Sequence, residues 1–89
     1  MNKKELRDKS KHLYALVRIG KSGIGETVIS EINKQLKLHK VVKIKLLKSF
    51  VGDNSRKDAA AQLKKDTGSD EMVLQGNTMT LYRKSSEKV

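Results

Sequence analysis

The clearest alternation of apolar and polar positions lies in the middle of the chain. Apolar residues recur at helical spacing over residues 28–36, which predicts a helix from Ile24 or Gly25 to Leu38. From Val41 to Leu47 the apolar positions instead follow a period of two, with lysines between them. This pattern is typical of a strand that has one face in a core and the other face basic.

Shorter patterns predict the other elements. The run from Tyr14 to Ile19 indicates a strand that ends at a glycine, and Gly76-Asn77 indicates a tight hairpin turn. Further elements are expected as follows: a helix over residues 3–13, a loop over Ser49 to Asn54, a helix over Arg56 to Thr67 stopped by Gly68, hairpin strands over Met72 to Gln75 and Thr78 to Arg83, and a frayed polar tail over residues 84–89.

The resulting order is α-β-α-β-α-β-β. Helices interspersed with strands and an antiparallel hairpin at the end predict a two-layer α/β sandwich, in which helices back a four-stranded mixed sheet. At 89 residues the chain can support only one small core, so we expect a single domain over residues 1–89.

Composition narrows the possible functions. The chain has no cysteine, which excludes thiol catalysis, thiolate metal sites and disulfides. Only three residues are aromatic, so the core must be built from aliphatic side chains. No apolar run approaches the length of a membrane span and the N-terminus is polar, so we expect a cytoplasmic protein.

The charge is strongly positive, with a net value of +10. Residues 1–48 hold 13 basic and 4 acidic residues, whereas residues 49–89 hold 7 and 6. Such a field predicts a polyanionic partner. Nucleic acid is favoured over a membrane surface, because no basic helix carries the bulky aromatic face that enters a lipid interface.

The segment Gly20-Lys21-Ser22-Gly23 joins the first strand to the second helix. Two glycines allow close backbone approach to an anion, the lysine supplies charge, and a helix beginning just beyond adds free N–H groups. We interpret the segment as a phosphate-binding loop at the C-terminal end of a strand, where ligands tend to bind in α/β sheets. The alternative is a plain turn between a strand and a helix.

Other side chains could extend a nucleic-acid surface. The candidates for stacking on a base are Tyr14, Phe50 and Tyr82, although the last two could equally belong to the core. The basic candidates, each of which could alternatively be a solvated charge, are Arg18, Lys34, Lys37, Lys43, Lys45 and Arg83.

Catalysis has little support in the sequence. His12 and His39 are isolated and are best explained as surface or capping residues at helix ends. The glycine loop lacks the longer frame of a nucleotide-hydrolysing P-loop. We therefore expect no enzyme, no cofactor, no metal and no small-molecule substrate. The carboxylates without recognisable ligand spacing are Asp53, Asp58, Asp66, Asp70 and Glu71.

Four segments in order resemble the CRM domain, an RNA-binding module, in its stand-alone YhbY type found in bacteria and archaea. They are Ile19 to Ile24, the helix Val28 to Leu38, Val41 to Lys45, and Gly76 to Arg83, which is similar to the closing pattern G-x-T-x-x-L-Y-R of the family. The chain departs from the family at Ala15, where a proline is frequent, and at Lys40, where an acidic residue is frequent.

The resemblance implies a fold similar to the C-terminal domain of bacterial translation initiation factor three. It also implies binding of structured RNA, with ribosomal RNA in precursors of the large subunit as the partner, and it places the RNA contacts on Gly20, Lys21, Ser22 and Gly23. The grip would resemble that of the GXXG loop in KH domains, which joins two helices instead. We expect a monomer. The charge alone would also allow a small basic DNA-binding protein of the chromatin type.

Overall fold

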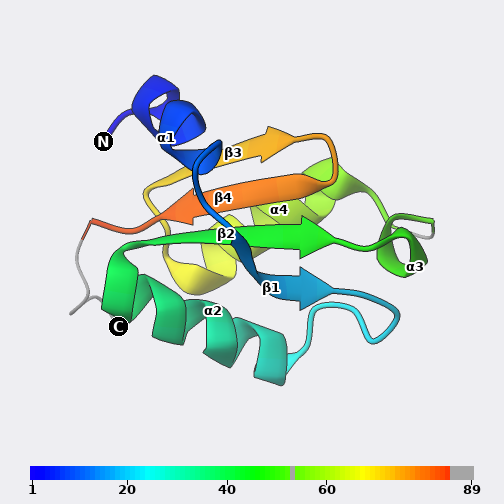
Figure 1. The fold of residues 1–89 in the computed structure, drawn as a ribbon. Coiled ribbons are helices and arrows are strands. Elements are labelled where there is room, and N and C mark those ends of the chain that lie inside the picture. The colour runs from blue at the N-terminus through cyan, green and yellow to red at the C-terminus, as the bar shows by residue number, and fades with distance from the viewer. Residues whose placement is uncertain (53, 85–89) are drawn as a thin grey trace.

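The computed structural model describes residues 1–52 and 54–84. The predicted order of helices and strands is confirmed, with one short helix added before the last long one (Figure 1). In chain order the elements are α1 (Lys3–Ser10), β1 (Ala15–Ile19), α2 (Glu26–His39), β2 (Val41–Leu46), α3 (Lys48–Val51), α4 (Arg56–Thr67), β3 (Glu71–Gln75) and β4 (Thr78–Tyr82).

The four strands form one mixed sheet in the order β1-β2-β4-β3. β1 and β2 are parallel, whereas β4 runs antiparallel to both of its neighbours. The C-terminal ends of β1 and β2 therefore lie at the same edge as the turn of the β3–β4 hairpin, on the right in Figure 1. The N-termini of α2 and α4 also face this edge (Figure 1), and we call it the loop edge.

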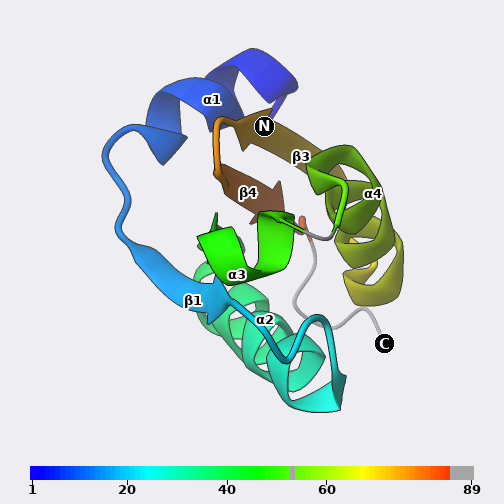
Figure 2. The same ribbon diagram turned by 90° about the vertical axis from the view of Figure 1, so that its right-hand side faces the viewer.

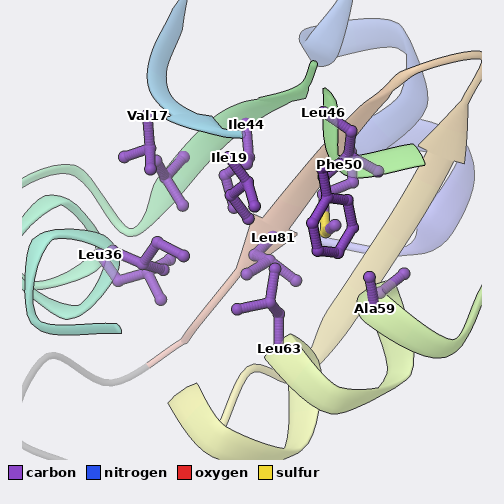
Figure 3. Close-up of a cluster of buried hydrophobic side chains, with 13 residues drawn as sticks. Val17, Ile19, Leu36, Ile44, Leu46, Phe50, Ala59, Leu63 and Leu81 are labelled. Atoms are coloured by element: carbon purple, nitrogen blue, oxygen red, sulfur yellow. The ribbon is translucent and has the colours of Figure 1, made fainter. Parts of the chain in front are cut away.

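The main core lies between one face of the sheet and the helices α2 and α4. Figure 3 shows Ile19 and Ile44 of the sheet facing Leu36 of α2 and Leu63 of α4. Each fully buried aliphatic side chain of this kind contributes about 1.5–3 kcal/mol. The period of two predicted for β2 is confirmed, because Val42, Ile44 and Leu46 enter this core and the lysines between them do not.

Helix α1 lies on the opposite face of the sheet, over β3 and β4 (Figure 2). Its buried Leu6 packs with Val41 and Val73 in a second, smaller cluster. The two-layer arrangement therefore holds for α2 and α4, and α1 adds a partial layer on the other side. This layer leaves part of the face formed by β1 and β2 exposed, which we call the open face.

Two predictions differ from the structure by more than the one or two residues seen at the other element ends. The first helix ends at Ser10 instead of residue 13, because the chain continues as turns in which Lys11 N–H donates to the Asp8 carbonyl and Leu13 N–H to the Ser10 carbonyl. The predicted loop at Ser49 to Asn54 contains α3, which is anchored by a buried Phe50. The predicted tail lies outside the described residues from 85 onwards.

Across the described ranges 1–52 and 54–84, we find no helix whose length and apolar character would suffice to cross a bilayer.

Candidate nucleic-acid interface

The loop after β1 is a hydrogen-bonded turn. Gly23 N–H donates to the Gly20 carbonyl at 2.9 Å, and Gly23 has a φ of 72°, a left-handed conformation that favours glycine. This turn places Lys21 and Ser22 at its two corners, where both are exposed. The geometry presents a lysine and a hydroxyl to solvent at the tip of the loop.

At Gly20, close packing against neighbouring side chains favours glycine. A Cβ at this position would lie 3.2 Å from Leu47 Cδ1 and 3.2 Å from Ser49 Oγ. In addition, Leu47 N–H donates to the Ile19 carbonyl at 2.8 Å. The start of the loop is thus packed against the junction of β2 and α3, and this contact fixes where Lys21 sits on the loop edge.

Backbone N–H groups in the loop and directly after it are available to a ligand. Among residues 1–52 and 54–84, the N–H groups of Lys21, Ser22 and Ile24 donate to no backbone or side-chain acceptor. Gly25, the N-cap of α2, provides no side-chain capping bond to the first turn of that helix. Free amides at the positive end of a 14-residue helix are a favourable environment for an anion.

A cleft of about 530 Å³ opens beside the loop. Lys21, Gly23 and Ile24 line one side of it, and residues from α3 to the first turns of α4 line the other. Ser55 caps α4 through its side-chain oxygen, which accepts from Asp58 N–H at 3.3 Å. The cleft is therefore bordered by Lys21 on one side and by a helix N-terminus on the other.

The open face carries a basic pair next to this edge. Arg18 of β1 and Lys45 of β2 are register partners, and both side chains are exposed. Neither β1 nor β2 contains an acidic residue. Like charges side by side on neighbouring strands repel each other. A bound anion would relieve that repulsion. Arg18 lies two residues before Gly20, so the pair is close to the start of the loop.

Lys43 is only partly exposed, and its ammonium group already makes one hydrogen bond within the protein. Its Nζ donates to the Ser10 carbonyl at 2.9 Å, at the C-terminal end of α1. A cation is favourable there because the carbonyls at the end of a helix carry partial negative charge. Lys43 therefore connects α1 to β2, in addition to lying on the open face.

The structure does not bring Lys34 and Lys37 to the loop. Both are exposed, but they belong to α2, which packs on the sheet face opposite to Arg18 and Lys45. Lys37 also lies about 16 Å along the helix axis from Glu26, at the rise of 1.5 Å per residue. These two lysines form a separate group of charges.

The prediction that Arg83 extends the exposed basic surface does not fit the structure. Arg83 is only 5% exposed. Its Nη1 donates to Asn33 Oδ1 at 2.9 Å and to the Thr67 carbonyl at 2.9 Å. The guanidinium thus joins α2 to the end of α4, and its position in the resemblance reflects a structural role in this chain.

The three aromatic side chains have different environments. Phe50 is buried in the main core, and Tyr82 packs against the second cluster. Tyr14 is 88% exposed. Of the three stacking candidates, Tyr14 is the one whose ring is available to a ligand.

Further basic residues at the loop edge were not identified from the sequence. Lys48 begins α3, and Arg56 and Lys57 begin α4. Arg56 Nη1 donates to the Gly76 carbonyl at 3.0 Å and to Asn77 Oδ1 at 3.2 Å, which fixes it against the hairpin turn. Basic residues in the first turn of a helix oppose its dipole, and this unfavourable placement is the signal that could have indicated them.

The carboxylates that the structure describes do not gather into a group suited to a metal ion. Within residues 1–52 and 54–84, no group of three or more histidine, aspartate or glutamate side chains is placed to hold a metal ion. Asp53 lies outside the described residues.

The chain matches a known protein family over most of its length. The family model of the CRS1/YhbY (CRM) domain matches residues 1–83. The chain belongs to the CRM domain family. The family membership predicted from the four segments is therefore confirmed.

Relatives of this CRM domain occur in bacteria and archaea. It is 32% identical over 85 residues to the probable RNA-binding protein YqeI of Bacillus subtilis, covering 96% of this chain and 86% of that protein. It is 33% identical over 81 residues to the probable RNA-binding protein MJ0652 of Methanocaldococcus jannaschii, covering 91% of this chain and 60% of that protein.

A solved structure has the same fold. The solution structure of the hypothetical protein SAV1595 from Staphylococcus aureus, described as a candidate RNA-binding protein, matches with a TM-score of 0.76 and 27% identity. The match covers 97% of this chain and 88% of that one.

Proposed function

We propose that this CRM domain binds structured RNA by gripping its phosphate backbone at the loop edge. The observation that carries the proposal is the turn at Gly20 to Gly23, which presents an exposed Lys21 beside free amides and a cleft. Arg18 and Lys45 extend the positive surface along the open face. The names of the bacterial and archaeal relatives support RNA as the polyanion.

The chemistry of this surface determines what it can recognise. Lysine, arginine and backbone N–H groups bind phosphates, which contributes affinity and orientation but carries no sequence information directly. Selectivity then depends on the shape of the RNA, as in other domains that track the backbone of folded RNA. Such binding weakens steeply as the salt concentration rises.

Competition between nucleic acids tests this proposal. At one fixed salt concentration, structured RNA fragments and DNA duplexes of matched length compete for the protein in a gel-shift assay. We expect the RNA to displace DNA at lower concentration. A clear preference for duplex DNA would contradict the proposal and favour a basic DNA-binding protein of the chromatin type.

We further propose that the RNA is ribosomal and that the domain acts during assembly of the large subunit. The resemblance to stand-alone members of the family supports this partner. Crosslinking the protein to RNA in its own cells and sequencing the recovered RNA tests it directly. Enrichment of large-subunit precursor sequences is expected, and recovery of unrelated RNA would contradict this assignment while leaving RNA binding intact.

We also propose a monomer without catalytic activity. Light scattering of the purified chain should give a mass near 10.0 kDa. Incubation with RNA or nucleoside triphosphates should leave both unchanged. Sustained turnover of either substrate would contradict the second part of this proposal.

A further inference from the structure

A second groove lies at the other end of β1. It has a volume of about 400 Å³ and is formed where the end of α1, the start of β1 and the junction of α2 with β2 meet. The chain linking α1 to β1 passes over the sheet on the side of α1 (Figure 1). This groove is separate from the cleft beside the glycine loop, which is lined by other residues.

Two large side chains with apolar surface are exposed to solvent in this groove. Tyr14 is 88% exposed and Leu16 is 56% exposed, although the contact of their apolar surface with water is unfavourable. Both line the groove. An exposed tyrosine beside an exposed leucine offers a flat apolar surface of the kind on which a planar ring can stack.

The basic side chains that line the groove are lysines and histidines. Among residues 1–52 and 54–84, Lys9, Lys43, His12 and His39 line it, and no aspartate or glutamate does. Lysine ammonium groups attract phosphate, and imidazole nitrogens can donate or accept hydrogen bonds with the edges of bases. Stacking surface and phosphate donors therefore occur together within one groove.

We propose that this groove holds an unpaired base of the RNA, with the base stacked on Tyr14 and its phosphate near Lys9 and Lys43. The inference rests on the proposed function, because the loop edge supplies the main grip on the same RNA. Unpaired nucleotides are the part of an RNA whose bases are free to stack on aromatic side chains.

The position of the groove fits a second contact along the same RNA. Tyr14 and Gly20 are separated by about 20 Å of extended chain at the rise of a β-strand. Between them, Arg18 and Lys45 are exposed on the open face. An RNA held at Lys21 can follow this basic path, so that nucleotides leaving its paired region arrive at Tyr14.

Charge argues against a second copy of this chain as the occupant. The protein has a net charge of +10, and the groove is lined by cationic or neutral groups, so two such grooves would repel each other. The same charge attracts a polyanion. An acidic protein partner is the competing occupant that the experiment must separate from RNA.

The test compares RNA stems that share one paired region. One stem is blunt, and the others carry a short unpaired extension at the 5′ or the 3′ end. The wild-type protein should bind at least one extended stem about five- to one-hundred-fold more tightly than the blunt stem, the range for one stacked base. Tyr14→Ala should remove this preference, and Tyr14→Phe should keep it.

Three further measurements accompany this test, and the first separates failure of this inference from failure of the proposed function. Lys21→Ala should weaken binding of blunt and extended stems by the same factor, because it acts at the loop edge. Circular dichroism should show that Tyr14→Ala is folded, as expected for a ring that is 88% exposed. An iodouracil base placed in the extension should crosslink to Tyr14 in the wild-type protein.

Three results would overturn the inference. They are equal binding of all stems by the wild-type protein, an unchanged preference in Tyr14→Ala, and crosslinking of the extension to residues away from the groove. If blunt stems still bind in a Lys21-dependent manner, the proposed function survives these results. If no stem binds, the proposed function itself is contradicted.

Discussion

Arg18 of β1 and Lys45 of β2 are paired across two parallel strands, and both side chains are exposed on the open face. Two cations at this spacing repel each other, and the strands that carry them contain no acidic residue to compensate. The repulsion between the two side chains therefore lowers the free energy of unfolding of the unbound protein. The placement of the pair is explained if an anion binds over it.

Neutralising one member of this pair should change protein stability and RNA affinity in opposite directions. Lys45→Gln should raise the free energy of unfolding by about 0.5 kcal/mol, because cross-strand repulsion is removed. The same change should weaken RNA binding severalfold. Urea denaturation and fluorescence anisotropy measure the two effects. A variant that binds RNA as tightly as the wild type would show that Lys45 is only a solvated charge.

Gly23 offers a matched pair of substitutions. Nothing lies within 4 Å of a Cβ at this position, and its φ of 72° is a conformation that asparagine and aspartate both tolerate. Gly23→Asn and Gly23→Asp should therefore lose similar stability, about 1 kcal/mol. The two side chains have nearly the same shape and differ in charge.

The carboxylate of Gly23→Asp stands beside Lys21 and should repel phosphate. We expect roughly fivefold weaker RNA binding than for Gly23→Asn, since a nearby like charge near a protein surface has this order of effect. Titrations of both variants with the same RNA measure the ratio. Equal affinities would indicate that the loop serves only as a turn.

Arg83 should behave as a structural residue. The planar guanidinium of Arg83 donates through Nη1 to Asn33 Oδ1 and the Thr67 carbonyl and through Nη2 to the Asn33 carbonyl. Arg83→Lys has a single nitrogen at the end of a flexible chain and cannot reach all three acceptors, so it should lower the free energy of unfolding by about 2–4 kcal/mol. RNA affinity of the folded variant, measured at low temperature, should stay within experimental error. An unchanged urea midpoint together with weaker RNA binding would reverse this assignment.

Lys40 ends α2 in a left-handed conformation, with a φ of 65°. A lysine is strained there and glycine is not, so Lys40→Gly should raise the free energy of unfolding by about 1 kcal/mol. RNA binding should change little, because Lys40 lies at the other end of α2 from the loop. A lower melting temperature would contradict this account of the helix end.

Much of the arrangement at the loop edge could be predicted from the sequence. The strand pattern ends at Gly20 and a helical pattern begins soon after, so the loop had to join a strand to a helix. The period of two in β2 also identified which of its side chains enter the core. Both signals come from neighbouring residues, and hydrophobic periodicity reports such local relationships well.

Other features depend on contacts between distant segments. Arg83 donates to Asn33, 50 residues earlier in the chain, so its burial left no local signal. Helix α1 buries only Leu6 and Ser10, too little to show which face of the sheet it covers. The groove at Tyr14 exists because α1, β1, α2 and β2 meet there, which single segments cannot reveal.

The salt dependence of RNA binding by Lys21→Gln tests the central claim most directly. Each lost phosphate contact should reduce the slope of log affinity against log salt concentration by about 1. The matched control is Lys65→Gln, which removes an exposed charge from the last turn of α4. The account predicts a smaller slope for Lys21→Gln and the wild-type slope for Lys65→Gln. Identical slopes for both variants and the wild type would contradict a phosphate grip at this loop.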